Sequence, residues 1–203
     1  MILIIGSEGS MGKRYQAILK HLSQPFEGWD PKHGTAPCHP EKYSRFIIAS
    51  PTDTHLGWVK ALDQYGKPIL CEKPLSKDLG EVEEILKCKS ELTMMMQYTW
   101  LFDRYSFGHS SYNYYQHGPD GLIWDCFQII ALARHEVELK EDSPIWKCVI
   151  NGKPIRRGDM DEAYVGFVSA WLKGIVPAAK QRLLEWHRKV KDYEEKWNSQ
   201  ASA

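Results

Sequence analysis

The hexapeptide CEKPLS, residues 71–76, has the residue types that proton-transfer chemistry requires. An ammonium group such as that of Lys73 can stabilise a developing alkoxide or pass a proton to it. Glu72 can orient the lysine, and Pro74 restricts the backbone of the turn. Because the apolar run GKPIL comes directly before this hexapeptide, we expect the Glu72–Lys73 pair at the end of a buried strand. The pair is then either a strand-end cap or part of an active site.

A glycine-rich turn, GSEGSMG, follows the apolar run MILII at the start of the chain. Apolar residues at helical spacing come next, so we expect the glycines at a strand-to-helix turn. Such a turn directs free backbone N–H groups and the positive end of a helix dipole at one point, where a pyrophosphate can bind. The residues expected to contact the phosphates are Gly6, Ser7, Gly9, Ser10, Met11 and Gly12.

Asp30 ends the segment FEGWD, about 20 residues beyond the glycine turn, where the ribose-binding acid of a dinucleotide site belongs. A carboxylate there disfavours a 2′-phosphate and so favours NAD over NADP, although Lys32 and His33 are close enough to weaken this preference. The glycine spacing is G-x-x-G-x-x-G rather than G-x-G-x-x-G, so it is not decisive alone. The other interpretation of Asp30 is a solvated turn residue before Pro31.

Strands and helices alternate around these residues. The predicted elements after residue 30 are a strand over 45–50, a helix over 54–66, a strand over 67–71, a helix over 79–89 and a strand over 91–98. This alternation predicts an α/β fold, a Rossmann-like doubly wound parallel sheet, whose ligands bind at the carboxyl ends of the strands. GSEGSMG, SPTDTH and CEKPLS would all lie at that edge.

Four segments within residues 6–105 resemble, in their order, the Gfo/Idh/MocA family, the glucose-fructose oxidoreductase and inositol dehydrogenase group of NAD(P)-dependent oxidoreductases. They are GSEGSMGKRY, ASPTDTH, CEKPLS and MMMQYTWLFDRY. The resemblance implies that Lys73 lies beside the nicotinamide and the reacting C–O group, and that Pro74 is held cis. The residues that it implies on the nicotinamide side of the cofactor are Ser50, Pro51, His55, Glu72, Lys73 and Pro74.

The chain departs from the family pattern in two places. Only about fifteen residues separate Asp30 from the strand over 45–50, so one α/β unit should be missing and the adenosine side of the pocket altered. Family members often have Asp-x-x-x-His on a later helix, and here Asp125 is followed by Ile129, which cannot transfer a proton. Asp125 is therefore either a site residue or a helix-surface carboxylate. Other groups that could supply an acid are Tyr98, His109, Tyr112 and His117.

The second half of the chain predicts a small α+β substrate or dimerisation domain over residues 98–203, after a dinucleotide-binding domain over 1–97. The predicted elements are a helix over 122–134, a hairpin over 145–155 with Asn151-Gly152 at its turn, a helix over 161–174 and a final helix from near Pro177. That last helix has an apolar stripe of Leu183, Trp186, Val190, Tyr193 and Trp197. It either packs on its own domain or pairs with a second subunit in a homodimer.

Composition excludes several classes of function. The 203 residues are 43% hydrophobic, enough for a core, and 26 basic residues balance 26 acidic ones, so neither nucleic acid nor acidic membranes are expected partners. No apolar run approaches the roughly 20 residues of a membrane span, and no export signal is visible. Five cysteines without C-x-x-C spacing and eight scattered histidines indicate reduced thiols, no metal site and a cytoplasmic protein.

The sequence thus predicts an oxidoreductase that moves a hydride between a nicotinamide cofactor and a hydroxyl-bearing carbon of a sugar, cyclitol or similar small polar molecule. NAD is the expected cofactor, with NADP as the second choice. Lys73 would be the acid or base, with Asp125 and Tyr98 as further candidates. The alternatives are a non-catalytic binder of a dinucleotide or nucleotide sugar, and an interaction protein without cofactor.

Overall fold

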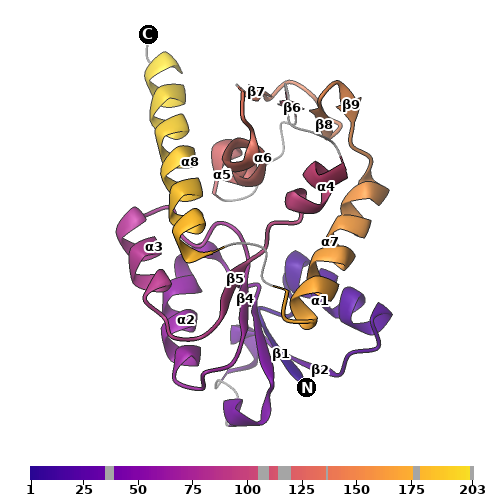
Figure 1. Ribbon diagram of the computed structural model, residues 1–203, viewed down its shortest axis with the longest axis vertical. Coiled ribbons are helices and arrows are strands. Elements are labelled where there is room, and N and C mark those ends of the chain that lie inside the picture. Colours follow the sequence, from indigo (N-terminus) through magenta and orange to yellow (C-terminus); the bar gives the residue numbers. More distant parts are fainter. Residues whose placement is uncertain (35–38, 105–109, 114–119, 136, 176–178, 202–203) are drawn as a thin grey trace. The chain divides into compact units, whose positions relative to one another are not determined.

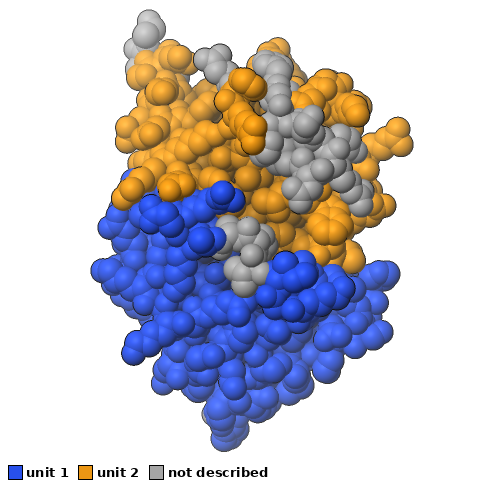
Figure 2. All heavy atoms as spheres, viewed as in Figure 1, with its two compact units in different colours: residues 1–95, 168–184 blue, residues 96–167, 185–203 orange. Residues whose placement is uncertain are grey.

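The computed structural model describes residues 1–34, 39–104, 110–113, 120–135, 137–175 and 179–201. The chain divides into two compact units, coloured separately in Figure 2. Unit 1 comprises residues 1–95 and 168–184, and unit 2 comprises residues 96–167 and 185–203. The first division lies close to the predicted boundary after residue 97. Segment 168–184, predicted as part of the second domain, groups with unit 1 instead.

Unit 1 is built on a five-stranded sheet in the order β2-β1-β3-β4-β5, and every neighbouring pair is parallel. The strands are β1 (Ile2–Ile5), β2 (Phe26–Trp29), β3 (Arg45–Ile48), β4 (Ile69–Cys71) and β5 (Leu92–Met94). β1, β4 and β5 are buried at every position, as expected for strands with both faces covered. The predicted α/β fold with a doubly wound parallel sheet is confirmed.

The helices of this sheet are α1 (Ser10–His21), α2 (His55–Asp63) and α3 (Leu79–Leu86). The chain moves from β1 to β2 in one direction along the sheet and from β3 to β5 in the other. Because such crossovers are right-handed, α1 covers one face while α2 and α3 cover the opposite face (Figure 1). The direction changes between β1 and β3, which is where sheets of this kind bind ligands.

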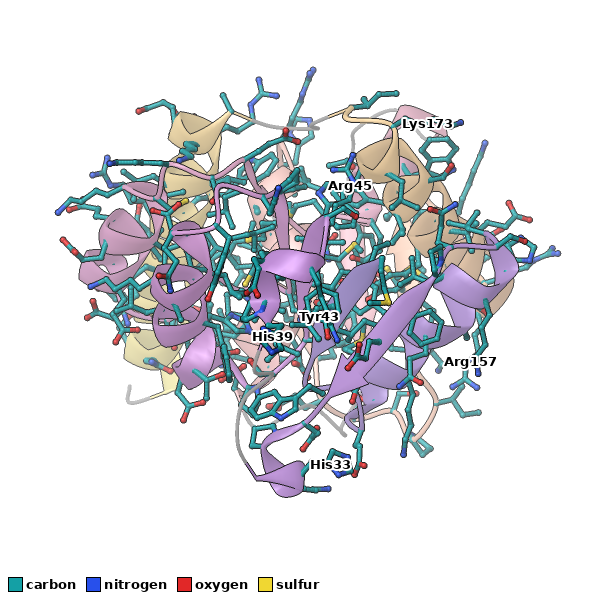
Figure 3. The ribbon with its side chains drawn as sticks, turned by 90° about the horizontal axis from the view of Figure 1, so that it is seen from below. His33, His39, Tyr43, Arg45, Arg157 and Lys173 are labelled. Atoms are coloured by element: carbon teal, nitrogen blue, oxygen red, sulfur yellow. The ribbon has the colours of Figure 1, made fainter. Side chains whose placement is uncertain are left out.

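The connection from β2 to β3 is short. Its described residues contain two 3-10 turns, Pro31–His33 and Pro40–Lys42, and no α-helix. His33, His39 and Tyr43 lie along it in Figure 3. Within the described part of the chain, β2 pairs with β1 and with no other strand. This agrees with the expectation that one α/β unit is missing.

Arg45 at the start of β3 (Figure 3) links this strand to segment 168–184 of the same unit. Its Nη2 donates to the Leu172 carbonyl at 3.1 Å, and its guanidinium lies 5.3 Å from the centre of the Trp171 ring. Lys180 adds a second link, because its Nζ donates to the Cys88 carbonyl. These polar contacts could not be predicted from the hydrophobic pattern of the chain.

Unit 2 contains a mixed four-stranded sheet in the order β7-β6-β8-β9. The strands are β6 (Ser110–Asn113), β7 (Val137–Lys140), β8 (Lys147–Ile150) and β9 (Lys153–Pro154). β6 is parallel to β7 and antiparallel to β8. Asn151 and Gly152 join β8 to β9 with φ values of 55° and 73°, the backbone of a type I′ turn, so the predicted hairpin is confirmed.

The remaining helices are α4 (Tyr98–Arg104), α5 (Leu122–Asp125), α6 (Phe127–Leu132), α7 (Arg157–Leu172) and α8 (Lys180–Ala201). The prediction of one helix over residues 122–134 is wrong. Cys126 has φ −82° and ψ 8°, outside the α-helical range, and separates α5 from α6. The predicted start of the last helix, near Pro177, lies outside the described residues.

The part of α8 that belongs to unit 2 packs on that unit. His187 is fully buried with its ring centre 4.7 Å from that of Phe127, and the Tyr193 hydroxyl donates to the Val137 carbonyl at 2.7 Å. This is the packing on its own domain that the apolar stripe predicts as one of two alternatives. None of the helices in the described ranges has the length and apolar character needed to cross a bilayer.

Candidate functional site

The carboxyl edge of the unit 1 sheet gathers the predicted residues of that unit. Gly6 follows β1, Asp30 follows β2, and Glu72 follows β4 directly. Ser50 comes two positions after the end of β3. Since all these strands are parallel, their carboxyl ends meet at one edge. Residues far apart in sequence are thereby placed on the same rim of the sheet.

Two glycines of the GSEGSMG turn are required by close approach of the backbone. Gly6 has φ +79°, and a Cβ there would lie 2.7 Å from the Ala49 carbonyl oxygen. A Cβ on Gly12 would lie 2.1 Å from the Gly6 oxygen. Gly9 differs, because a Cβ there would meet only the Gly6 oxygen, at 3.5 Å. Its missing side chain therefore leaves room on the outer side of the turn.

The turn leads directly into α1, whose first N–H groups are not capped by a side chain. Gly9 is the residue before the helix. The Lys13 N–H donates the first hydrogen bond of the helix, to the Gly9 carbonyl at 2.9 Å. The three residues before Lys13 are Ser10, Met11 and Gly12. They form the first turn, in which the N–H groups of an α-helix have no partner within the helix. With the open space at Gly9, this arrangement fits a pyrophosphate.

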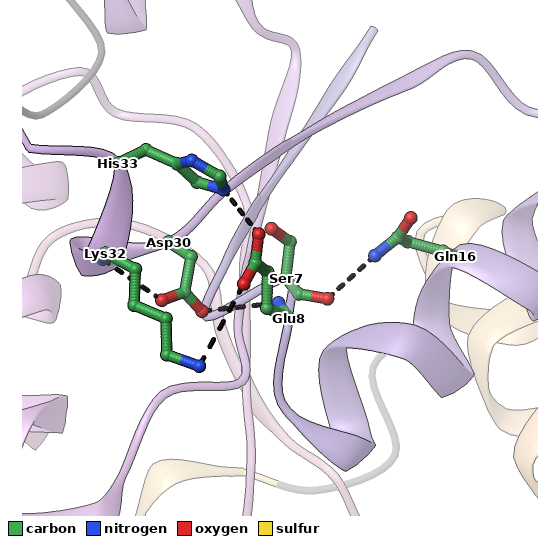
Figure 4. A network of polar contacts seen from close by, with 6 residues as sticks. All are labelled: Ser7, Glu8, Gln16, Asp30, Lys32 and His33. Carbon is green, nitrogen blue, oxygen red and sulfur yellow. Dashed lines mark hydrogen bonds and ion pairs between the residues drawn. The ribbon is translucent and has the colours of Figure 1, made fainter.

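Asp30 is buried, with 8% of its surface exposed, so it is not a freely solvated turn residue. Its Oδ2 accepts the Glu8 N–H at 3.2 Å and its Oδ1 accepts the Lys32 N–H at 3.3 Å (Figure 4). The carboxylate therefore joins the glycine turn to the end of β2. A carboxylate can accept about four hydrogen bonds, so both oxygens keep capacity for the hydroxyls of a ribose.

Glu72 is a buried carboxylate at the end of β4. Its Oε1 accepts the Tyr15 hydroxyl at 2.6 Å, and its Oε2 accepts the Lys73 backbone N–H at 3.1 Å. Burial raises the pKa of Glu72, while the Tyr15 hydrogen bond and the Lys73 charge act in the opposite direction. The role of Tyr15 could not be predicted from sequence, since a contact between residues 57 positions apart has no local signal.

Lys73 follows in a turn whose Lys73–Pro74 peptide bond is cis, as the family resemblance implies. The lysine is half-buried, between the buried residues Glu72 and Pro74. Its backbone is thus fixed on both sides, by the Glu72 hydrogen bond and by the proline ring. A side chain anchored in this way can hold an ammonium group at the carboxyl edge of β4.

His55 joins the two turns next to Lys73. Its Nδ1 lies 3.0 Å from the Pro74 carbonyl oxygen, and its Nε2 lies 2.9 Å from that of Ser50. Only 1% of the residue is exposed. The Ser50 hydroxyl lies 2.7 Å from that of Thr54, while Pro51 is exposed. His55 therefore positions the turns after β3 and β4, and the exposed Pro51 is the more accessible of these residues.

Tyr98 and Asp125 belong to unit 2, whereas Lys73 belongs to unit 1. Burial raises the pKa of the Tyr98 phenol well above its ordinary value, which makes it a poor proton donor near neutral pH. Its backbone N–H donates to Gln128 Oε1 at 2.9 Å. Gln128 itself is buried, and its Nε2 donates a hydrogen bond to Gln97 Oε1.

Asp125 is the half-buried last residue of α5, and Ile129 is buried in α6. The break at Cys126 means that the two positions do not share one continuous helix. Burial also raises the pKa of the Tyr112 phenol. His109 and His117 lie outside the described residues. Among those that the structure describes, no group of three or more His, Cys, Asp or Glu side chains could hold a metal ion.

Part of this chain matches a known protein family. Residues 36–99 match a family model described as "Oxidoreductase family, NAD-binding Rossmann fold", that of the Gfo/Idh/MocA proteins. The resemblance to the Gfo/Idh/MocA family is confirmed. The matched range contains SPTDTH and CEKPLS, while the glycine turn and Asp30 lie before it.

One curated relative and two solved structures illustrate the similarity. Inositol 2-dehydrogenase of Rhodococcus jostii (strain RHA1) is 41% identical over 46 residues, 23% of this chain and 13% of that protein. The WlbA (WbpB) dehydrogenase of Thermus thermophilus, solved with NAD and UDP-GlcNAcA, has a TM-score of 0.69 at 15% identity. The alignment covers 94% of this chain and 93% of the dehydrogenase chain. Biliverdin reductase of Synechocystis sp. PCC 6803, solved with biliverdin and NADP+, has a TM-score of 0.63 at 9% identity. The alignment covers 94% of this chain and 96% of the reductase chain.

The aligned segment thus spans only a small part of the curated relative's length. At these identities the two solved structures establish the fold and leave the substrate open. They hold different nicotinamide cofactors, NAD and NADP+, so the shared fold alone does not select between them.

Proposed function

We propose that the protein is an NAD(P)-dependent oxidoreductase that transfers a hydride between nicotinamide and a hydroxyl-bearing carbon of a sugar, cyclitol or similar small polar substrate. The observation on which this rests most is the Glu72–Lys73 pair at the carboxyl edge of β4. The names of the inositol 2-dehydrogenase and of the dehydrogenase solved with a nucleotide sugar agree with this substrate class.

The cofactor would be held by residues of unit 1. The glycine turn with the first N–H groups of α1 would bind the pyrophosphate, and Asp30 would bind the adenosine ribose. Ser50, Pro51 and the cis Lys73–Pro74 turn would flank the nicotinamide side. When bound, a nicotinamide dinucleotide supplies hydride transfer.

Lys73 would act on the proton that moves with the hydride. Its ammonium would donate a hydrogen bond to the substrate oxygen, stabilise the developing alkoxide and hold or release the proton there. Glu72 would fix the lysine backbone through the 3.1 Å hydrogen bond. Tyr15 would in turn fix Glu72. Asp125 remains a proposed substrate contact, and Tyr98 a lesser one because its phenol is buried.

The test is a turnover screen of sugars, cyclitols and nucleotide sugars with NAD and NADP, followed at the absorbance of the reduced cofactor. Lys73→Met should lower kcat by about 100-fold or more while cofactor binding is retained. Lys20→Met, a change at an exposed lysine of α1, is the matched control and should keep full activity. Unchanged turnover in Lys73→Met would show that Lys73 is not the acid or base.

A second candidate function is a non-catalytic binder of a dinucleotide or nucleotide sugar. Two observations favour it: Ile129 stands where a family proton donor is often found, and the described residues between β2 and β3 lack an α/β unit. Binding of NADH without turnover of any substrate in the screen would support this function over the enzyme.

We further propose a cytoplasmic location, since Cys71, Cys88 and Cys148 are buried free thiols. Cys38 lies outside the described residues. A homodimer stays a prediction of the apolar stripe, and sedimentation of the purified protein would test it.

A further inference from the structure

The glycine turn contains a charged residue, Glu8, for which the sequence alone predicts no role. It occupies the position that makes the G-x-x-G-x-x-G spacing one residue longer than G-x-G-x-x-G. Its backbone N–H donates to Asp30 Oδ2 at 3.2 Å. The Ser7 carbonyl next to it accepts Gln16 Nε2 at 2.7 Å, which ties this part of the turn to α1 (Figure 4). The position of Glu8 beside Asp30 is therefore fixed by the backbone.

The Glu8 side chain engages the two basic residues after Asp30. Its Oε1 lies 2.6 Å from His33 Nε2, and its Oε2 lies 3.9 Å from Lys32 Nζ (Figure 4). All three side chains remain partly exposed, with 41% of Glu8, 56% of His33 and 75% of Lys32 accessible. They are thus within reach of a ligand bound at Asp30.

These contacts decide the charge that a ribose 2′-position would meet. Asp30 and Glu8 supply two carboxylates against the single ammonium of Lys32. If the Glu8 carboxylate were absent, Lys32 and His33 could instead bind a 2′-phosphate, which has a charge of about −1.5 to −2 near neutral pH. With Glu8 in place, its carboxylate engages Lys32 and His33 and would also repel the phosphate.

We propose that Glu8 is the specificity-determining residue that makes this site select NAD over NADP, by engaging Lys32 and His33. The inference rests on the proposed dinucleotide site of unit 1. It reverses the expectation from sequence that the two basic residues weaken the preference set by Asp30.

Calorimetric titration of NAD, NADH, NADP and NADPH into the purified full-length protein tests the inference without any need for a substrate. Glu8→Gln keeps the size and the backbone N–H of the residue and removes its charge. It should lower the ratio of Kd for NADP to Kd for NAD by tenfold or more. Glu27→Gln is the matched control, because it neutralises an exposed carboxylate of β2 that pairs with Lys42 instead, and should leave the ratio unchanged.

A third variant identifies the groups that take the phosphate. Adding Lys32→Ala and His33→Ala to Glu8→Gln should abolish the gain in NADP affinity. If the unchanged protein binds NAD and the ratio stays the same in Glu8→Gln, the role of Glu8 is refuted while the dinucleotide site stands. If the unchanged protein binds none of the four nucleotides, the site and the inference both fail.

Discussion

Glu72 is the residue on which the proposed site most directly depends. It is a carboxylate with 6% of its surface exposed, and burying an unpaired carboxylate would be costly. The Tyr15 hydroxyl and the Lys73 N–H offset that cost by donating one hydrogen bond to each oxygen. The same two bonds fix the turn that presents Lys73, so stability and function share these contacts.

Removing the Tyr15 hydroxyl should destabilise the protein. Tyr15→Phe deletes the 2.6 Å hydrogen bond to a buried carboxylate, and we expect the free energy of unfolding in urea to fall by roughly 1.5–3 kcal/mol. Tyr65→Phe is the control, since the Tyr65 hydroxyl has no hydrogen-bond partner among the described residues and its ring packs near Phe46. Equal effects of the two changes would contradict the role of Tyr15.

The raised pKa of Glu72 predicts a pH dependence of stability. In the unfolded chain Glu72 loses its proton near its ordinary pKa of 4.5, whereas burial raises the pKa in the folded protein. Between these two pKa values the folded state binds more protons, so the group's contribution to stability falls as pH rises. Glu72→Gln cannot ionise and should gain stability relative to the unchanged protein over that window.

Urea unfolding of both proteins from about pH 4 to about pH 8 measures this effect. The stability difference between Glu72→Gln and the unchanged protein should grow in favour of the variant with rising pH and then level off. A difference that is independent of pH would show that Glu72 has the same pKa in both states.

At the scale of elements, the β1–α1 turn separates glycines needed for folding from one needed for binding. A Cβ at Gly12 would overlap the Gly6 oxygen and come within 2.6 Å of the Ser7 Cα, whereas Gly9 has space beside it. The turn is therefore shaped by Gly6 and Gly12 and left open at Gly9. Two alanine substitutions can distinguish these roles.

Gly12→Ala should lower the free energy of unfolding by about 1–3 kcal/mol or more, because the backbone must move to admit the methyl group. Gly9→Ala should keep stability within about 1 kcal/mol, since the nearest atom is 3.5 Å away. Its methyl group would occupy the space proposed for the pyrophosphate, so calorimetry should show weaker NAD binding. Undiminished binding in Gly9→Ala would argue against a phosphate at this turn.

The elements that could be predicted from sequence are those with a local signal. The strands of unit 1 are short apolar runs bounded by glycine, proline or an acid, and their carboxyl-edge turns placed Gly6, Asp30 and Glu72 correctly at the end of strands. β6 was missed because SSYN lacks an apolar run, and the break at Cys126 has no glycine or proline to mark it. Tyr15 and Glu8 were missed because their partners come from distant or irregular segments.

At the scale of the whole molecule, the balance of charges affects solubility. The formal net charge is zero at pH 7 and the isoelectric point is about 7.1. Without a net charge, molecules do not repel one another over long range. The protein should therefore be least soluble near pH 7 and more soluble near pH 9, which light scattering at matched concentrations would measure. Constant solubility across this interval would contradict the prediction.

The division of the chain has a consequence for dissecting the protein into pieces. The polypeptide passes from one unit to the other three times, after residues 95, 167 and 184, and the latter two crossings lie inside α7 and α8. A fragment ending at residue 95 would lose Leu172 and Trp171, the partners of Arg45, and expose the surface that they cover. A simple N-terminal fragment therefore lacks part of unit 1, and a circularly permuted or internally shortened chain that retains residues 168–184 is the better starting point for isolating this unit.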